Sequence, residues 1–284
     1  RVPIIQHADV RRMLLWMKAH VEGFRALTYY TAYCEDLVRA SADEALRDKS
    51  KGIIEVLTPI VKAYCSDMAF KVTELAIQTY GGYGYCSEYP VEQFMRDLKI
   101  ASIYEGANGI QALDLVGRKL GMKKGMYFMS LLGEMNATVA AYQGNAALKD
   151  LASDVQKSVN TLAELAMYFA GSAKAGKFLI PVGNAYPFLM LMGKVVMGWL
   201  LLWEAGVARE RLEGIASAKG IDLSDGGQVS ALAKADADAA FYIGKVSAAR
   251  YFIKHVLPEV DAAVTSIRSE DLSMIDIPEE AFAS

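Results

Sequence analysis

The sequence is poor in residues that bind metals or form cross-links. It has three cysteines (Cys34, Cys65 and Cys86) and three histidines among 284 residues. The odd cysteine count and the spacing fit neither a disulfide framework nor a metal-ligand pattern, so we interpret these residues as reduced thiols of a cytoplasmic protein. The histidines are too scattered in the sequence to suggest a site, and we expect no metal.

The chain also lacks an excess of basic charge. It has 30 Lys and Arg residues against 33 Asp and Glu residues, which gives a net charge of −3 and a pI of about 5.7. This balance argues against a nucleic-acid partner. Hydrophobic residues make up 53% of the chain, which is enough for a folded core and excludes a largely disordered chain.

Strand patterns are nearly absent, and the apolar residues recur at the spacing of α-helices. Asp9 is placed to cap a first helix, and Gly81-Gly82 to end a second one. Asn108 and Gln111 resemble a capping box at the start of a fourth. We predict helices over about 9–40, 42–80, 91–100, 108–121, 186–218 and 229–257, with a loop over 181–187.

A short polar stretch, 122–125, divides the predicted helices into two groups. After it, apolar residues keep a spacing of three and four from Leu148 to Phe169. We therefore predict an all-α protein in which a helical bundle over residues 1–121 is followed by a second helical bundle over residues 126–284.

One segment is long and apolar enough to be tested as a membrane span. Residues 186–203 are apolar apart from Lys194, and they include Pro187, Gly193 and Gly198. A lysine at the centre of a membrane helix costs about 3 kcal/mol, so we favour a buried helix and expect no transmembrane segment.

Residues 78–111 contain five glycines and five tyrosines between two predicted helices. Glycine lets the backbone turn tightly or approach a ligand closely. Two interpretations therefore stay open, a pair of tight turns with aromatic packing and a ligand site.

Glu105 sharpens that choice, because it stands between an apolar pair, Ile103-Tyr104, and Gly106. A carboxyl partly desolvated by such neighbours has a raised pKa and can act as a general base. The alternative is a solvated acid at the start of a helix, where the helix dipole favours negative charge.

Several linked motifs in this region resemble the acyl-CoA dehydrogenase family. They follow one another in the order Gln78-Thr79-Tyr80-Gly81-Gly82-Tyr83-Gly84-Tyr85, Glu88-Tyr89-Pro90-Val91-Glu92, Arg96-Asp97-Leu98-Lys99-Ile100, Ile103-Tyr104-Glu105-Gly106 and Ile110-Gln111. The resemblance extends more weakly back to Pro3. Residues from 126 onward resemble the extra helical domain of a longer subgroup, which includes 3-methylmercaptopropionyl-CoA dehydrogenases.

The resemblance implies an FAD-dependent oxidation of an acyl-CoA thioester across its α,β bond. In the family a glutamate takes the α-proton and FAD accepts the β-hydride at N5, and Glu105 occupies the place of that glutamate. The backbone N–H of Glu105 would help to hold the thioester oxygen, and Tyr104 and Gly106 would flank the thioester. Arg96 and Asp97 are interpreted as a structural ion pair.

The glycine motif carries a second implied role. By resemblance Gln78, Thr79, Tyr80, Gly81 and Gly82 contact the FAD of a neighbouring subunit, which implies a homodimer or homotetramer. The implied electron acceptor is an electron-transfer flavoprotein. The sequence departs from the family at Ala8, Ala107 and Gly109, where members often carry side chains that reach the flavin. We therefore expect FAD as the cofactor, with detailed contacts that differ from those of other members.

The family fold also has an N-terminal helical domain and a β domain, and neither is recognisable here. The chain opens at Arg1 with no initiator methionine, which we interpret as a start inside a longer protein. We expect this piece alone to bind FAD poorly and to be inactive. The alternatives are a non-catalytic helical interaction module and, within the enzyme class, an acyl-CoA oxidase.

Overall fold

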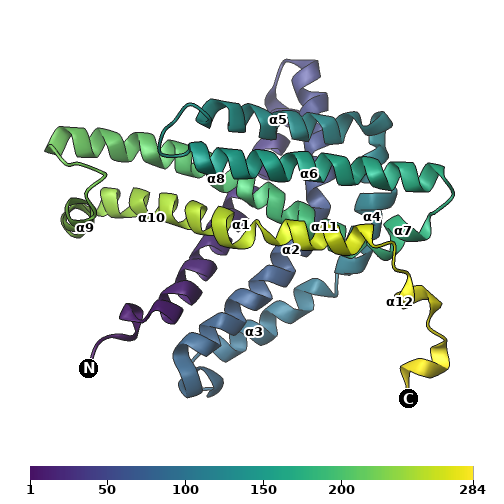
Figure 1. The fold of residues 1–284 in the computed structure, drawn as a ribbon, viewed down its shortest axis with the longest axis horizontal. Coiled ribbons are helices and arrows are strands. Elements are labelled where there is room, and N and C mark those ends of the chain that lie inside the picture. Colours follow the sequence, from purple (N-terminus) through teal and green to yellow (C-terminus); the bar gives the residue numbers. More distant parts are fainter. Residues whose placement is uncertain (284) are drawn as a thin grey trace.

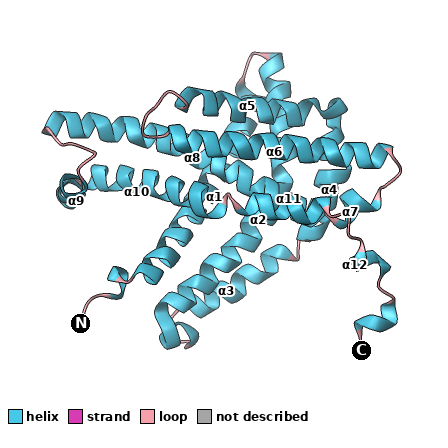
Figure 2. Cartoon of the chain, in the orientation of Figure 1, coloured by secondary structure: helices cyan, strands magenta, loops and turns pink. Residues whose placement is uncertain are grey.

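The computed structural model describes residues 1–283, and within this range the chain forms helices and no β-strand (Figure 2). The all-α prediction is confirmed. The α-helices are α1 (Ala8–Ala40), α2 (Glu44–Tyr80), α3 (Val91–Lys99), α4 (Asn108–Gly117), α5 (Met126–Tyr142), α6 (Lys149–Lys174), α7 (Leu179–Gly183), α8 (Ala185–Lys219), α9 (Gly226–Ala235), α10 (Ala237–Tyr251), α11 (Glu259–Arg268) and α12 (Ser273–Asp276).

The helices form one packed body from which a helical hairpin projects. In Figure 1, α5, α6, α8, α10 and α11 run across the view, and α1 and α2 pass obliquely behind them. The C-terminal half of α2 leaves this body and α3 returns alongside it. The segment between α3 and α4, which carries Glu105, therefore lies where the hairpin rejoins the body.

The apolar helix α8 lies in the core. It is long and apolar enough to cross a membrane by length and composition, but 78% of its most apolar stretch is buried against other helices. Trp199, near its centre, is fully buried. This is the environment of a core helix, as the sequence predicts.

Buried side chains from both sides of residues 122–125 form one continuous cluster. Two glycines allow the close contacts between the two parts. A Cβ on Gly193 of α8 would lie 2.2 Å from the ring of Tyr64 in α2, and one on Gly52 would lie 2.1 Å from the ring of Tyr127 in α5. The predicted division into residues 1–121 and 126–284 stays a prediction, since a shared core neither requires nor excludes it.

The ends of two helices differ from the prediction. The prediction that Asp9 caps α1 is wrong, because His7 is the N-cap and the Asp9 carboxylate accepts a hydrogen bond from Arg12 Nε at 2.8 Å. Asp43 caps α2 instead, accepting hydrogen bonds from the N–H groups of Ala45 (2.9 Å) and Leu46 (3.2 Å).

The predicted loop over 181–187 is also wrong, because Leu179–Gly183 forms the short helix α7. Pro181 fits there because the first turn of a helix needs no intrahelical N–H donor.

The single last helix expected over 229–257 is two helices. Asp236 adopts an extended conformation (φ −140°, ψ 114°) and accepts a hydrogen bond from Ala239 N–H at 2.9 Å. The aspartate thus ends α9 and caps α10, an alternative to helix continuation that short acidic side chains offer. A π-helical turn over Phe252–Val256 then leads to Pro258 and α11.

Candidate active site

Glu105 stands in a strained turn between a 3-10 turn, Ile100–Ser102, and the start of α4. Its φ is 56°, and that of Gly106 is 86°. The left-handed conformation suits glycine, but for a residue with a Cβ it costs about 1–2 kcal/mol. Strain of this kind is concentrated at functional sites, where the surrounding structure holds the residue in place.

The side chains around Glu105 face outward. Glu105 itself is exposed, as are Tyr104 (51%) and Ile103 (56%). Among residues 1–283 its carboxylate has neither a hydrogen bond nor an ion pair. The expectation that its apolar neighbours desolvate Glu105 is therefore wrong for the described residues, because those neighbours point to solvent and do not enclose the carboxyl.

The start of α4 is anchored to α2 by Asn108, only 5% of which is exposed. Its Nδ2 donates to the carbonyl of Ala63 (3.2 Å) and to Ser66 Oγ (2.9 Å), and its Oδ1 accepts from Lys62 Nζ at 2.7 Å. The predicted capping box is wrong: Ala107 is the N-cap, and no side chain caps the helix. The Gln111 side chain lies over Gly106 instead, where Nε2 would be 2.7 Å from an added Cβ.

Sequence reasoning missed Lys62 and Ser66 as parts of this site. They stand four residues apart on one face of α2, within a stretch whose other residues are largely buried and apolar. A polar pair inside an apolar stretch indicates a buried polar contact, but the sequence does not show that its partner is Asn108.

The glycine motif forms the far end of the hairpin. Gly81 (φ 65°) ends α2, and a Cβ on Gly81 or Gly82 would meet no atom within 4 Å. Gln78 is exposed, Tyr80 is half-exposed, and the hydroxyl of Thr79 donates to the carbonyl of Leu75 at 2.8 Å. The surface beside Gly81 and Gly82 is therefore not covered by other described residues of the chain.

Tyrosine rings pack against one another in the hairpin, and polar contacts lie along α3. The ring centroid of Tyr89 lies 6.0 Å from that of Tyr80 and 5.6 Å from that of Tyr83. The ion pair predicted between Arg96 and Asp97 is not formed. Helical geometry directs the two side chains to different partners: Arg96 pairs with Glu92 one turn earlier (3.5 Å), and Asp97 accepts from the amide of a glutamine on α3 at 2.6 Å.

The two predicted parts of the site are well separated within one chain. Asn108 is bonded to residues 62–66 of α2, whereas Gly81 follows the C-terminal end of the same helix. At 1.5 Å per residue, the 15 to 19 residues between these points span about 25 Å. The fold thus brings Tyr104, Glu105 and Gly106 together at one end of the hairpin and leaves the glycine turn at the other.

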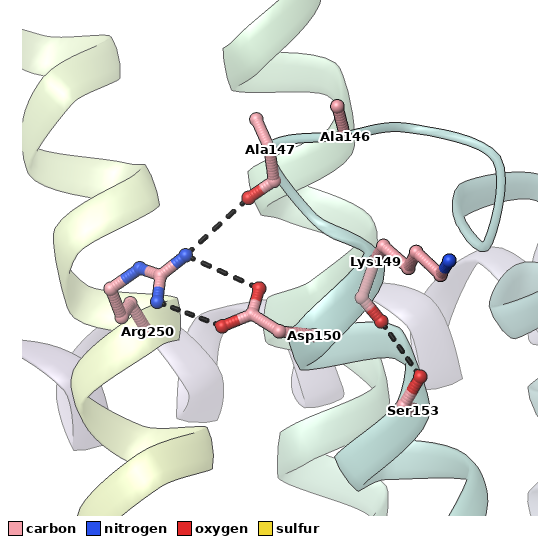
Figure 3. Close-up of a pocket in the computed structure, with 6 residues that line it drawn as sticks. All are labelled: Ala146, Ala147, Lys149, Asp150, Ser153 and Arg250. Carbon is pink, nitrogen blue, oxygen red and sulfur yellow. Dashed lines mark hydrogen bonds and ion pairs between the residues drawn. The ribbon is translucent and has the colours of Figure 1, made fainter. Parts of the chain in front are cut away.

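The pocket drawn in Figure 3 is held together by structural ion pairs. Arg250 of α10 donates to both carboxylate oxygens of Asp150 in α6 (3.0 and 3.3 Å) and to the carbonyl of Ala147 at 3.4 Å. Burial acts to raise the pKa of Asp150, but the hydrogen bonds and positive charges of Arg250 and Lys254 together outweigh it and leave that pKa below its usual value. These contacts join two helices and offer no group for catalysis.

Two further pockets lie between α8 and its neighbours. One, of about 520 Å³, is walled by aromatic residues of α1, α8 and α10, including Tyr30, Trp203 and Phe241. The other, of about 420 Å³, includes His20, whose Nδ1 lies 2.9 Å from the carbonyl oxygen of Trp16. Burial lowers the pKa of His20 to about 4, so its ring is neutral at pH 7. Neither pocket includes Glu105 or the glycine turn.

Two known protein families match nearly the whole chain between them. Residues 1–121 match the family described as acyl-CoA dehydrogenase, C-terminal domain, and residues 131–278 match the family described as acetyl-CoA dehydrogenase C-terminal like. The second match alone covers more than half of the chain.

Curated relatives match over almost the full chain. The broad-specificity linear acyl-CoA dehydrogenase FadE5 of Mycobacterium tuberculosis is 34% identical over 99% of this chain and 44% of its own length. A 3-methylmercaptopropionyl-CoA dehydrogenase of Ruegeria pomeroyi is 36% identical over 96% of this chain and 43% of its own length. The chain thus spans less than half the length of these relatives.

Solved structures show the same fold at lower identity. ACDH-11 of Caenorhabditis elegans, in complex with C11-CoA, has a TM-score of 0.65 and 18% identity over 96% of this chain and 42% of its own. An acyl-CoA dehydrogenase of Bacillus anthracis complexed with FAD has a TM-score of 0.65 and 17% identity over 99% of this chain and 44% of its own. Taken with the matches in sequence, the fold places the chain in the acyl-CoA dehydrogenase family, of which it forms the C-terminal helical part.

Proposed function

We propose that this chain works as the C-terminal part of a flavin-dependent acyl-CoA dehydrogenase that oxidises an acyl-CoA to the trans-2-enoyl-CoA, with Glu105 as the base. The observation that carries this proposal is the Glu105 turn. A non-glycine residue held in a left-handed conformation presents an unpaired carboxylate at an exposed surface. Such a carboxylate is free to face a substrate bound between this surface and another part of the enzyme.

The chemistry of the reaction requires a base at this kind of position. The α-proton of a thioester is weakly acidic, so its removal needs a placed carboxylate and a polarised carbonyl. The backbone N–H of Glu105 can donate to the thioester oxygen, while Tyr104 and Gly106 flank the thioester. Burial of Glu105 by the bound acyl-CoA and the rest of the enzyme supplies the desolvation that this chain does not.

The residues of the glycine turn fit the edge of a flavin nucleotide. Gly81 and Gly82 leave open space where other residues carry a Cβ, as close approach of a phosphate to the backbone requires. At the other end of the hairpin, Ala107 and Gly109 provide no side-chain donor. FAD, when bound, supplies the acceptor for the β-hydride. This chain holds such a group only by its edge, so we expect the 284-residue chain alone to retain little flavin and to show no turnover.

The separation of about 25 Å between the two ends of the hairpin supports a homodimer or homotetramer. One chain can then offer Glu105 to its own active site and Gln78, Thr79, Tyr80, Gly81 and Gly82 to that of a neighbour. We also propose an electron-transfer flavoprotein as the acceptor and a cytoplasmic location, which the three free cysteine thiols support.

A non-catalytic helical module is less well supported, because relatives with dehydrogenase names match over 96% or more of the chain. An acyl-CoA oxidase stays the alternative within the enzyme class, since the acceptor is not determined by these residues. Turnover under anaerobic conditions with an artificial electron acceptor, compared with turnover in oxygen alone, separates the two.

The decisive experiment replaces Glu105 by Gln in the full-length protein. We expect exchange of the α-proton with solvent deuterium to fall by about 10²–10⁴-fold while bound flavin, measured by its absorbance, is unchanged. Glu88→Gln is the matched control, because Glu88 is an exposed acid of the same hairpin. Retained exchange in Glu105→Gln would assign the base to another residue.

A further inference from the structure

Asn108 is a buried polar side chain three residues after Glu105, in the first turn of α4. An asparagine at the start of a helix commonly caps it. Here the side chain turns away from its own helix and reaches α2, where its partners lie 42 to 46 residues earlier in the chain. One side chain thus connects the Glu105 turn to the hairpin.

Both the oxygen and the nitrogen of the Asn108 side-chain amide have hydrogen-bond partners. Lys62 donates to Oδ1 at 2.7 Å, and Nδ2 donates to the carbonyl of Ala63 and to Ser66 Oγ. The Ser66 hydroxyl in turn donates to the Ala63 carbonyl at 3.2 Å. An aspartate has no protons for the Ala63 carbonyl, and a leucine would remove the partner of Lys62. The arrangement therefore selects an amide at this position.

The network is close enough to Glu105 to determine its backbone. Only Gly106 and Ala107 separate Glu105 from the anchored residue, and both Glu105 and Gly106 have a positive φ. On the other side, the N–H of Tyr104 donates to the carbonyl of Ile100 at 3.2 Å. Strained conformations persist where the structure fixes both ends, and these bonds fix both ends of the turn.

We propose that Asn108 and Lys62 are positioning residues that hold Glu105 in the orientation its reaction needs. The inference rests on the proposed role of Glu105 as the base. Neither residue touches the substrate; both act through the backbone of the turn. Displacement of a catalytic group by about 1 Å can slow a reaction about 100-fold, so a loosened anchor reduces turnover even where the protein stays folded.

The test uses the full-length protein and an acyl-CoA that the wild-type protein oxidises. We expect Asn108→Ala and Lys62→Met to lower kcat and α-proton exchange by about 10- to 100-fold, with KM and bound flavin nearly unchanged. Lys62→Arg keeps a charged donor and is expected to restore most of the rate. Loss of kcat without loss of substrate or flavin binding is a result that a purely structural role does not produce.

A matched control separates positioning from general destabilisation. Thr138 accepts a hydrogen bond from Trp199 Nε1 at 2.8 Å, which joins α5 to α8 without involving the Glu105 turn. Thr138→Val therefore removes a comparable polar link between helices. If it lowers kcat as much as Asn108→Ala at an equal loss of thermal stability, or if Lys62→Met and Asn108→Ala keep wild-type kcat, the inference is wrong. If Glu105→Gln itself retains exchange, the proposed function fails independently of the anchor.

Discussion

The two ends of the helical hairpin are both exposed turns that contain a residue with positive φ, but the residue differs. At the glycine turn, Gly81 takes the positive φ without a Cβ and nothing lies over it. At the Glu105 turn, a residue with a long side chain also takes a positive φ, and Asn108 connects the next helix to α2. The comparison teaches that strain is retained where a side chain is needed, and is avoided where the backbone alone is offered.

The strongest test of this comparison is to convert the Glu105 turn into a glycine turn. Glu105→Gly relieves the left-handed strain and is expected to stabilise the chain by about 1 kcal/mol against urea unfolding. In the full-length protein the same change removes the base and should slow turnover by about 10²–10⁴-fold. Stability and activity would thus change in opposite directions. A destabilised Glu105→Gly chain would show that the turn is not strained.

A smaller effect is expected at the neighbouring glycine. Gly106→Ala places a Cβ at φ 86°, which should cost about 1–2 kcal/mol of unfolding free energy. The added Cβ would also approach Nε2 of Gln111, but that atom is at the flexible end of its side chain and can move, so the contact adds little to this cost. Gly109→Ala is the control, because Gly109 lies in the first turn of α4 with open space around it, and alanine there should stabilise the helix by up to about 1 kcal/mol. Equal effects of the two changes would contradict the difference in backbone conformation.

Sequence patterns predicted what local chemistry determines. The spacing of apolar residues gave α1, α2 and α8, and Gly81-Gly82 gave the end of α2. The anchor of Asn108 could not be predicted in the same way, because its partners are 42 to 46 residues away and depend on how α2 and α4 pack. The exposure of Glu105 differs from the prediction for a related reason. The sequence shows that Glu105 is flanked by apolar residues, but it does not show whether their side chains point into the protein or to solvent.

The smallest expected effects distinguish the two glycines of the open turn. Gly81→Ala should cost about 1 kcal/mol or more of unfolding free energy, because φ 65° with ψ −146° is a conformation that side chains rarely adopt. Gly82 does not have a positive φ, so Gly82→Ala should leave the chain unchanged or stabilise it by up to about 1 kcal/mol. In the full-length protein the methyl group of Gly82→Ala would fill space that is open here, and flavin affinity should fall although the chain is as stable as before. Flavin affinity is measured by titration of the flavin-free protein. An unchanged affinity would contradict the proposal that flavin closely approaches the backbone at Gly82.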